Sequence, residues 1–396
     1  MPPVASTVLA RLWRVAPRQA VIAEGYIKMK TRMFALLTML VLVVAACGGS
    51  TATSPEASES TAAAYKACVA FDTGGLGDKG FNDLAKKGLD DAAAAGFDTA
   101  YAEAAGASDY ESNIQRLIDE GCQSIVVVGF TQTGAAVAAT KANPEVAFAL
   151  IDGTWNPLGD DYTDGTADDN GAYPANFTGI TFNVNESGML AGYLAAGMSK
   201  TGKVCTYGGG QFPGVTYFMD GLDAGIAYYN EKNSASVALL GWSAKDQKGT
   251  FINGDNPWGD PAKGAELAKS FYDQGCDVAN PVSGSTGNGT YEFMMKKGAY
   301  SIGVDTDQAL SLPQYAGTLM TSNQKGIDVA VLDTLKKNQG GDLGGEDVVG
   351  TLANGGVLIS PYHDLDSAIS AELKAAVDQL KADIIAGTIV VADYYK

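Results

Sequence analysis

Histidine is almost absent from this chain, since His363 is the single one among 396 residues. Zinc sites built on imidazole and Ser-His-Asp triads both need histidine, so these two kinds of enzyme have almost no raw material here. His363 itself is expected to be an isolated surface residue. Basic side chains are scarce as well, because 27 Lys and Arg stand against 45 Asp and Glu and give a net charge of −18. Such a charge repels phosphates, which argues against nucleic acid as a partner.

A run long enough to span a bilayer is also missing, because the apolar segment at residues 33–46 is too short. This segment follows Lys30 and Arg32 and ends in the sequence V-A-A-C, which is the organisation of an export signal. The ending is similar to the bacterial lipobox, in which the cysteine is lipidated and becomes the first mature residue. We therefore expect residues 1–46 to be a leader and lipoprotein signal peptide, and Cys47 to be the lipidation site. A plain secretory signal is the alternative.

Residues 47–65 are rich in Gly, Ser, Thr and Ala and show no apolar periodicity, which is typical of a flexible tether. A lipid on Cys47 would hold the folded body beside the membrane. The expected location is the extracytoplasmic face of the bacterial cell membrane, with the lipid as the anchor.

A literal G-x-G-x-x-G lies at Gly75, Gly77 and Gly80, after a strand-like run at residues 68–71. Alone, this pattern matches the fingerprint of a dinucleotide-binding loop. Two observations argue against it. Dinucleotides are not normally supplied outside the cytoplasm, and the Asp78 carboxylate within the loop would repel a pyrophosphate. We therefore expect no cofactor, and a loop in which glycine lets the backbone approach another ligand.

Beyond residue 65, short apolar strands alternate with amphipathic helices, which predicts parallel α/β architecture. The plan repeats, since "KACVAFDTGG" has a counterpart in "GKVCTYGGGQ" and "NIQRLIDEGCQSIVVVG" in "ELAKSFYDQGCDVANPVSG". We expect an N-terminal lobe of residues 66–182 plus about 325–350, and a C-terminal lobe of residues 183–324 plus about 351–396. Two such Rossmann-like lobes would enclose a central ligand cleft beyond the carboxyl ends of their strands.

Four cysteines occupy matched places in the two halves. Cys68 would start the first strand and Cys122 precedes the third, and these strands are neighbours in the order 2-1-3. Cys205 and Cys276 hold the equivalent places in the second half. We expect disulfides Cys68–Cys122 and Cys205–Cys276, with four buried free thiols as the alternative. No metal site is expected, because C-x-x-C spacing is absent and the acidic stretch 159–171 lacks EF-hand spacing.

An exported, tethered chain with two α/β lobes resembles the substrate-binding lipoproteins of ABC importers. Within them it is similar to the BMP family, basic membrane lipoproteins that include the purine-nucleoside receptors. The motifs are "GDKGFND", "IDG", "GGGQFPGVTYFMDGLDAG", "SGSTGNG", "IGVDTDQ", "TSNQKG" and the ending "IIAGTIVV", in this order. The resemblance implies type I periplasmic-binding-protein architecture, a small-molecule ligand, ABC permease subunits as partners and no enzymatic activity.

The resemblance also implies a site. In this family the loop after the first strand supplies a stacking aromatic and polar groups, and further contacts come from "IDG" and from the second lobe. The matching positions are Asp78, Phe81, Asn82, Asp152, Phe218, Asp305 and Lys325. The family more usually has serine between the acidic residue and the aromatic one. Structural alternatives remain open: Asp78 as a helix cap, the two phenylalanines as core residues and Lys325 as a solvated helix residue.

The expected ligand follows from these side chains. Aromatic rings on facing lobes can sandwich a base, while carboxylates accept hydrogen bonds from ribose hydroxyls and base N–H groups. The carboxylates would repel a phosphate, which favours a purine nucleoside over a nucleotide. Riboflavin and sugars are the alternative ligands, and a ligand-sensing lipoprotein is the alternative function.

Overall fold

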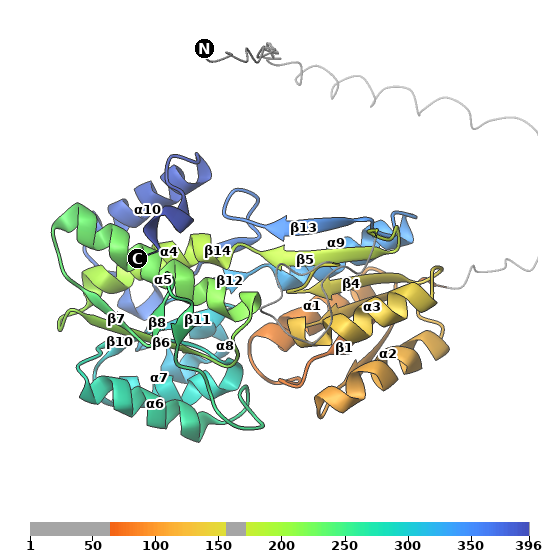
Figure 1. Cartoon of the computed structure of the whole chain (residues 1–396), viewed down its shortest axis with the longest axis horizontal. Helices are drawn as coiled ribbons and strands as arrows, with labels where there is room; N and C mark the ends of the chain where they lie inside the picture. The colour runs from red at the N-terminus through yellow and green to blue at the C-terminus, as the bar shows by residue number, and fades with distance from the viewer. Residues whose placement is uncertain (1–63, 156–171, 396) are drawn as a thin grey trace, which may run out of the picture. The chain divides into compact units, whose positions relative to one another are not determined.

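Two six-stranded sheets carry the folded part of the chain, which the computed structural model describes over residues 64–155 and 172–395 (Figure 1). The expected signal peptide, the Cys47 lipidation site, most of the tether and the acidic stretch 159–171 lie outside these residues. Among the described helices, none combines the length and apolar character that crossing a membrane requires.

The N-terminal lobe is a parallel sheet covered by helices on both faces. Its strand order is β13-β5-β4-β3-β1-β2 and every neighbouring pair is parallel. Helices α1 and α9 pack together on one face, and α2 and α3 pack together on the other. The strands are β1 (Lys66–Phe71), β2 (Asp98–Glu103), β3 (Ser124–Val128), β4 (Ala147–Ile151), β5 (Phe177–Phe182) and β13 (Glu346–Gly350); the helices are α1 (Phe81–Ala94), α2 (Tyr110–Asp119), α3 (Thr133–Ala142) and α9 (Ile327–Gln339).

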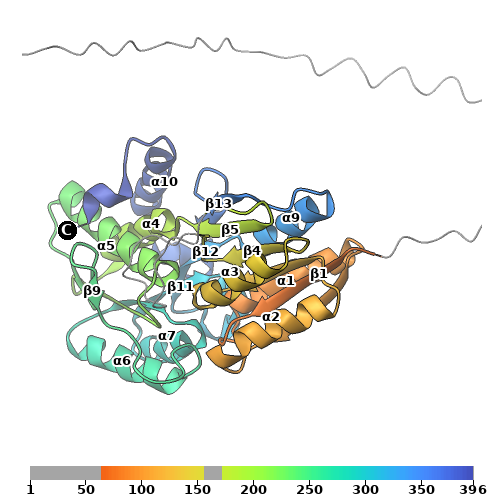
Figure 2. The ribbon, with the colours of Figure 1, turned by 45° about the vertical axis from the view of Figure 1, so that its right-hand side comes forward.

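The C-terminal lobe repeats this plan with an antiparallel edge strand. Its order is β14-β12-β11-β10-β6-β7, and only β14 runs antiparallel to its neighbour. Helices α4 and α5 pack on one face, α6 and α7 lie together on the other, and α10 packs against α4 (Figures 1 and 2). The strands are β6 (Lys203–Gly208), β7 (Ala238–Leu240), β10 (Val278–Val282), β11 (Tyr300–Asp305), β12 (Leu319–Lys325) and β14 (Val357–Ile359); the helices are α4 (Val184–Met198), α5 (Pro213–Asn233), α6 (Pro261–Asp273), α7 (Gly287–Lys296), α8 (Gln308–Ser311) and α10 (Ala371–Ile385).

Burial explains why these segments form central strands. Strands β3, β4 and β10 are buried at every position, as expected when helices cover both faces of a parallel sheet. The predicted class of fold, two α/β lobes each built on a largely parallel sheet, is therefore confirmed. The structure also contains the bonds Cys68–Cys122 and Cys205–Cys276, each of which joins the first strand of a lobe to the turn before the next central strand.

The chain passes between the two sheets at three places: after Phe182, after Lys325 and after Gly350. Helix α9, which follows the second crossing, packs on α1 of the N-terminal lobe. Its Asn338 Nδ2 donates to Ser124 Oγ at 2.6 Å, which fixes the helix against β3. Because of these crossings, the carboxyl ends of strands from both sheets face each other, and residues far apart in the sequence lie close together there.

Candidate ligand-binding site

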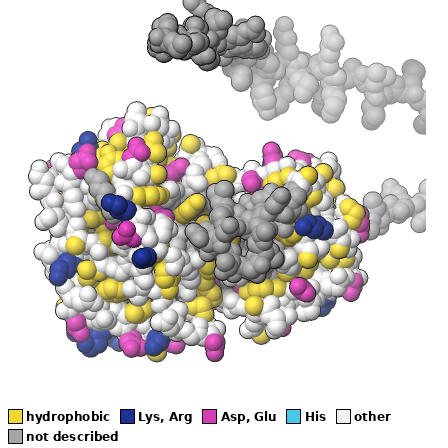
Figure 3. Space-filling view, in the orientation of Figure 1, with side chains coloured by type: hydrophobic (Ala, Val, Ile, Leu, Met, Phe, Trp, Pro, Cys, Tyr) yellow, Lys and Arg dark blue, Asp and Glu magenta, His cyan; other side chains and the backbone are white. Residues whose placement is uncertain are grey.

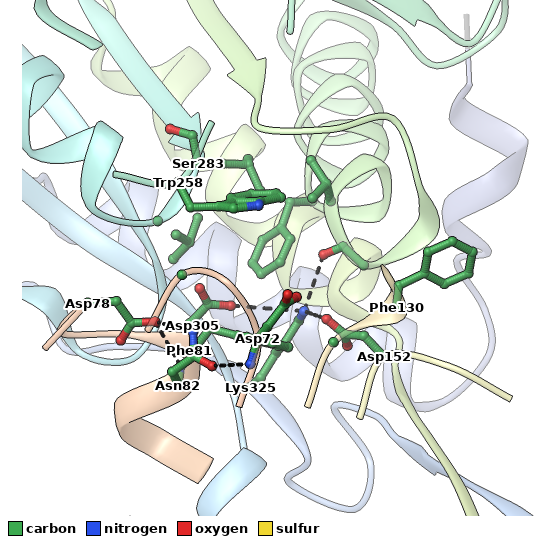
Figure 4. Close-up of a pocket in the computed structure, with 18 of the residues that line it drawn as sticks. Asp72, Asp78, Phe81, Asn82, Phe130, Asp152, Trp258, Ser283, Asp305 and Lys325 are labelled. Carbon is green, nitrogen blue, oxygen red and sulfur yellow. Dashed lines mark hydrogen bonds and ion pairs between the residues drawn. The ribbon is translucent and has the colours of Figure 1, made fainter. Parts of the chain in front are cut away.

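A buried cavity lies where the carboxyl ends of strands from both sheets face each other (Figure 4). The space between its walls is about 610 Å³, including its opening to solvent. All the residues that the sequence predicted for the site line it, so the fold brings them together. They come from the α1 turn, the ends of β4, β11 and β12, and the first turns of α5.

The Asp78 carboxylate is engaged with its own loop. It accepts hydrogen bonds from the backbone N–H groups of Gly80 at 2.9 Å, Asn82 at 2.8 Å and Asp83 at 3.2 Å. The Asn82 Nδ2 group donates a further bond at 3.0 Å. From two residues before the N-cap Gly80, Asp78 therefore accepts from N–H groups of the first turn of α1, a capping role that was the structural alternative for this residue. Its contribution to the cavity is to fix the turn that carries Phe81.

Two aspartates stand at equivalent strand ends in the two lobes. Asp152 directly follows β4 and Asp305 is the last residue of β11, and both have positive φ, 61° and 64°. Such backbone is strained for a residue other than glycine, and strain of this kind gathers at functional sites. The turn aims both carboxylates at Lys325, the last residue of β12 (Figure 4).

Lys325 is the buried cation of this site. Its Nζ donates to Asp152 Oδ2 at 2.5 Å and to the Gly214 carbonyl oxygen at 3.2 Å, and it lies 3.9 Å from Asp305 Oδ1. Its side chain is 2% exposed, so the sequence-based alternative of a solvated helix residue is wrong. Among the described residues that line the cavity, four are aspartates and Lys325 is the single cation, so the lining carries an excess of negative charge.

Burial decides the protonation of Asp305. Loss of solvent around its carboxyl group raises the pKa to about 7, and the opposing attraction of Lys325 does not cancel this effect. Near neutral pH this group therefore exchanges between an acceptor and a donor of hydrogen bonds. A ligand that offers a donor would stabilise the ionised form.

Aromatic rings surround the charged groups. Lys325 Nζ lies 5.1 Å from the ring centroid of Phe81 and 5.0 Å from that of Phe218, within the range of a cation–π contact. Trp258 also lines the cavity, on the side across from Asp152 and Lys325 (Figure 4). Its six-membered ring passes so close to the backbone that a Cβ at Gly209 would lie 2.2 Å from it. The rings come from both lobes, an arrangement that can sandwich a planar ligand.

Sequence reasoning missed several lining residues. Asp72 directly follows β1 and accepts from Tyr110 Oη at 2.5 Å and from the Thr73 N–H at 2.7 Å. Its place after a buried strand is the same signal that identified Asp152, and it could have been used. Trp258 belongs to the segment between β9 (Lys248–Gly249) and α6, whose composition resembles a solvent-exposed loop. Phe130, Phe212 and Ser283 also line the cavity.

The expectation for His363 was wrong. Its Nε2 lies 2.7 Å from Asp307 Oδ2, and the side chain is only 23% exposed, so the residue is paired rather than isolated. Over residues 64–155 and 172–395 there is no cluster of three or more His, Cys, Asp or Glu side chains suited to a metal ion. On the face that Figure 3 shows, Lys and Arg are scattered among the described residues and form no basic patch for nucleic acid.

Two α/β lobes with a polar and aromatic cavity between them, joined by three crossings, have the architecture of the type I periplasmic-binding-protein fold. Residues 65–394 match the Bmp family, described as ABC transporter substrate-binding protein PnrA-like. The chain therefore belongs to this family of ABC transporter substrate-binding proteins, as the resemblance implied.

Individual relatives agree with this assignment. The chain is 30% identical over 387 residues to "ABC transporter nucleoside-binding protein BmpA" of Lactococcus lactis, covering 92% of this chain and 99% of that protein. It is 28% identical over 327 residues to "Basic membrane protein A" of Borreliella burgdorferi, covering 80% and 85%. A solute-binding protein of an ABC transporter system from Aeropyrum pernix superposes with a TM-score of 0.69 at 25% identity, covering 82% of this chain and 92% of that one.

Proposed function

We propose that this chain captures purine nucleosides outside the cytoplasmic membrane, where a lipid on Cys47 holds it, and delivers them to the permease of an ABC importer. The observation that carries the proposal is the cavity itself, which places aromatic rings of both lobes beside buried carboxylates and a lysine. Membership of the family supports the role in an ABC transporter, and the similarity to the nucleoside-binding protein of Lactococcus lactis supports a nucleoside as the ligand.

The two parts of a nucleoside match two parts of the lining. A purine has an apolar face that stacks on rings such as Phe81 and Trp258, and this contact tolerates different bases. Ribose hydroxyls donate to carboxylates and accept from an ammonium group, which the pair Asp152–Lys325 supplies at one end of the cavity. A 5′-phosphate would add negative charge to a lining that already has an excess of aspartates, and it would lose its hydration without gaining a matching cation. The lining therefore favours nucleosides over nucleotides.

Lobe closure accompanies binding in this proposal. The lobes, residues 66–182 with about 325–350 and residues 183–324 with about 351–396, contact each other directly around the cavity. Ser311 Oγ donates to the Lys79 carbonyl oxygen at 3.0 Å. Lys325, at the end of β12 in the C-terminal sheet and at the crossing between the lobes, donates to Asp152, which follows β4 of the N-terminal sheet. A ligand buried this deeply enters only when these contacts separate, so binding requires rotation about the three crossings.

Thermal unfolding of the purified protein with a panel of ligands tests this function. The panel contains adenosine, inosine, guanosine, free purine bases, riboflavin, ribose and adenosine 5′-monophosphate. A bound nucleoside at ~100 times its dissociation constant should add about 2.7 kcal/mol to the free energy of unfolding. Stabilisation by riboflavin or a sugar, with none by any nucleoside, would reject the ligand class. Release of free base during incubation would reject a pure binding role.

A further inference from the structure

A stacked pair of phenylalanines closes one end of the ligand cavity. Phe130 follows β3 in the N-terminal lobe and Phe212 precedes α5 in the C-terminal lobe. Their ring centroids lie 5.3 Å apart and the ring planes differ by 11°, so the two rings are stacked across the lobes. Both residues line the cavity. The pair therefore forms part of the boundary of the site in addition to joining the lobes.

A second cavity lies on the other side of this boundary and encloses about 970 Å³, including its opening to solvent. The two cavities share three described lining residues: Phe130, Asp152 and Gly214. Figure 4 shows Phe130 and Asp152 at the same end of the ligand cavity, away from Asp78. The shared residues therefore form the partition between the two spaces, and the phenyl ring is its largest side chain.

Neighbouring residues hold the partition in place. The turn that carries Phe130 is fixed by two bonds: Thr133 Oγ1 donates to the Phe130 carbonyl oxygen at 2.5 Å, and Gln132 Nε2 donates to that of Val128 at 2.7 Å. On the other lobe, a Cβ at Gly210 would lie 2.6 Å from the Phe212 ring, so the ring packs directly on the backbone there. Local contacts therefore fix the backbone that carries Phe130 and the packing of the Phe212 ring.

The position of the partition relates it to the ligand. Asp152 belongs both to the partition and to the ion pair with Lys325, the part of the lining assigned to ribose. In the orientation that we propose, the 2′ and 3′ hydroxyls of the nucleoside contact the Asp152–Lys325 pair and its 5′ hydroxyl faces the phenyl rings. Any bulky group added at that position would have to displace the stacked pair to reach the second cavity.

We propose that the Phe130–Phe212 stack is the end wall of the site on its sugar side, and that it limits ligand length by excluding purine nucleosides with a bulky 5′ substituent. This inference rests on the proposed function, since it assumes that a nucleoside occupies the cavity. It adds a determinant of specificity in two apolar side chains. Removing one ring should join the two cavities and admit the longer ligand.

Isothermal titration with adenosine and 5′-O-benzyladenosine tests the wall, because the added benzyl ring matches the ring that Phe130→Ala removes. The unmodified protein should prefer adenosine by roughly 100-fold or more, and Phe130→Ala should reduce this preference by at least roughly 10-fold. Phe212→Ala should act in the same direction, since Phe130 loses its stacking partner. Val349→Ala is the matched control, because Val349 lines only the second cavity, and it should leave the preference unchanged.

Phe130→Leu, which keeps most of the apolar volume, replaces the alanine variant if that variant does not fold, and a smaller shift in the same direction is then expected. An unchanged preference for adenosine in both Phe130→Ala and Phe212→Ala would overturn the proposed role of the stack, while nucleoside binding itself would stand. Equal binding of both ligands by the unmodified protein would overturn it as well. Failure of the unmodified protein to bind any nucleoside would overturn the proposed function, and this inference with it.

Discussion

Replacing Asp305 by asparagine should stabilise the ligand-free protein, and the gain should grow with pH. Burial raises the pKa of this carboxyl group to about 7 from an ordinary value of 3.8, so the folded protein keeps the proton over a range where the unfolded chain has lost it. A raised folded pKa makes the contribution of Asp305 to stability greatest below the unfolded pKa, and this contribution is lost as pH rises toward 7.

The size of the effect follows from the width of that window. Each unit of pKa difference corresponds to about 1.36 kcal/mol, and about two units separate pH 5 from the folded pKa. The free energy of unfolding of Asp305→Asn, relative to the unmodified protein, should therefore rise by about 2–3 kcal/mol between about pH 5 and about pH 8. Asparagine carries no charge over this range, so the free energy of unfolding of the variant is not lowered by the burial of an ionised carboxylate.

Urea unfolding at a series of pH values between these limits measures the difference, after any co-purified ligand has been removed. Asp90→Asn is the control, since Asp90 is 61% exposed in a surface ion pair with Lys86. Its effect should stay within about 0.5 kcal/mol and should not change with pH. A stability difference for Asp305→Asn that is constant with pH would refute the reasoning from burial.

Three further predictions concern the same residues and their support. Replacing Lys325 by methionine leaves two buried carboxylates without their cation and should cost about 3–5 kcal/mol in the free energy of unfolding, measured by urea titration at about pH 8. Phe81→Ala and Trp258→Ala should each weaken nucleoside binding by about 1–3 kcal/mol, with a similar loss for different purines; a loss confined to one base would argue for edge recognition instead of stacking. Peptide mapping of the exported protein without reductant should recover Cys68 joined to Cys122, and replacing both by serine should cost about 2–5 kcal/mol; alkylation of these thiols in the native protein would contradict the bond.

The fold was predictable because each half of the sequence alternates short apolar strands with amphipathic helices, a pattern that can be recognised locally. Runs such as residues 125–128 are uniformly apolar, and this pattern is typical of a strand covered on both faces. The repeat of the cysteine-containing strand and the following glycine loop then gave two lobes. What the sequence could not give was the antiparallel edge strand β14, because three residues carry too little periodicity to identify a strand or its direction.

The site was predictable in part, and the misses have physical reasons. Lys325, Asp152 and Asp305 meet because they end three strands whose carboxyl ends converge, a consequence of parallel topology. Trp258 could not be placed, because a loop of Gly, Asn, Asp and Pro carries no pattern that fixes where one aromatic side chain points. Asp78 matched the family motif, yet its hydrogen bonds go to the backbone of its own turn, a choice that sequence leaves open.

Isothermal titration of the mature protein with inosine, guanosine, adenosine and adenosine 5′-monophosphate tests the central claim most directly, with Asp305→Asn titrated in parallel. We expect the unmodified protein to bind nucleosides at one site per chain and the monophosphate at least roughly 10-fold more weakly, since the lining is acidic. Loss of the Asp305 carboxylate should weaken nucleoside binding by about 1.5–3 kcal/mol. Tighter binding of the monophosphate, or nucleoside affinity unchanged in the variant, would contradict the account.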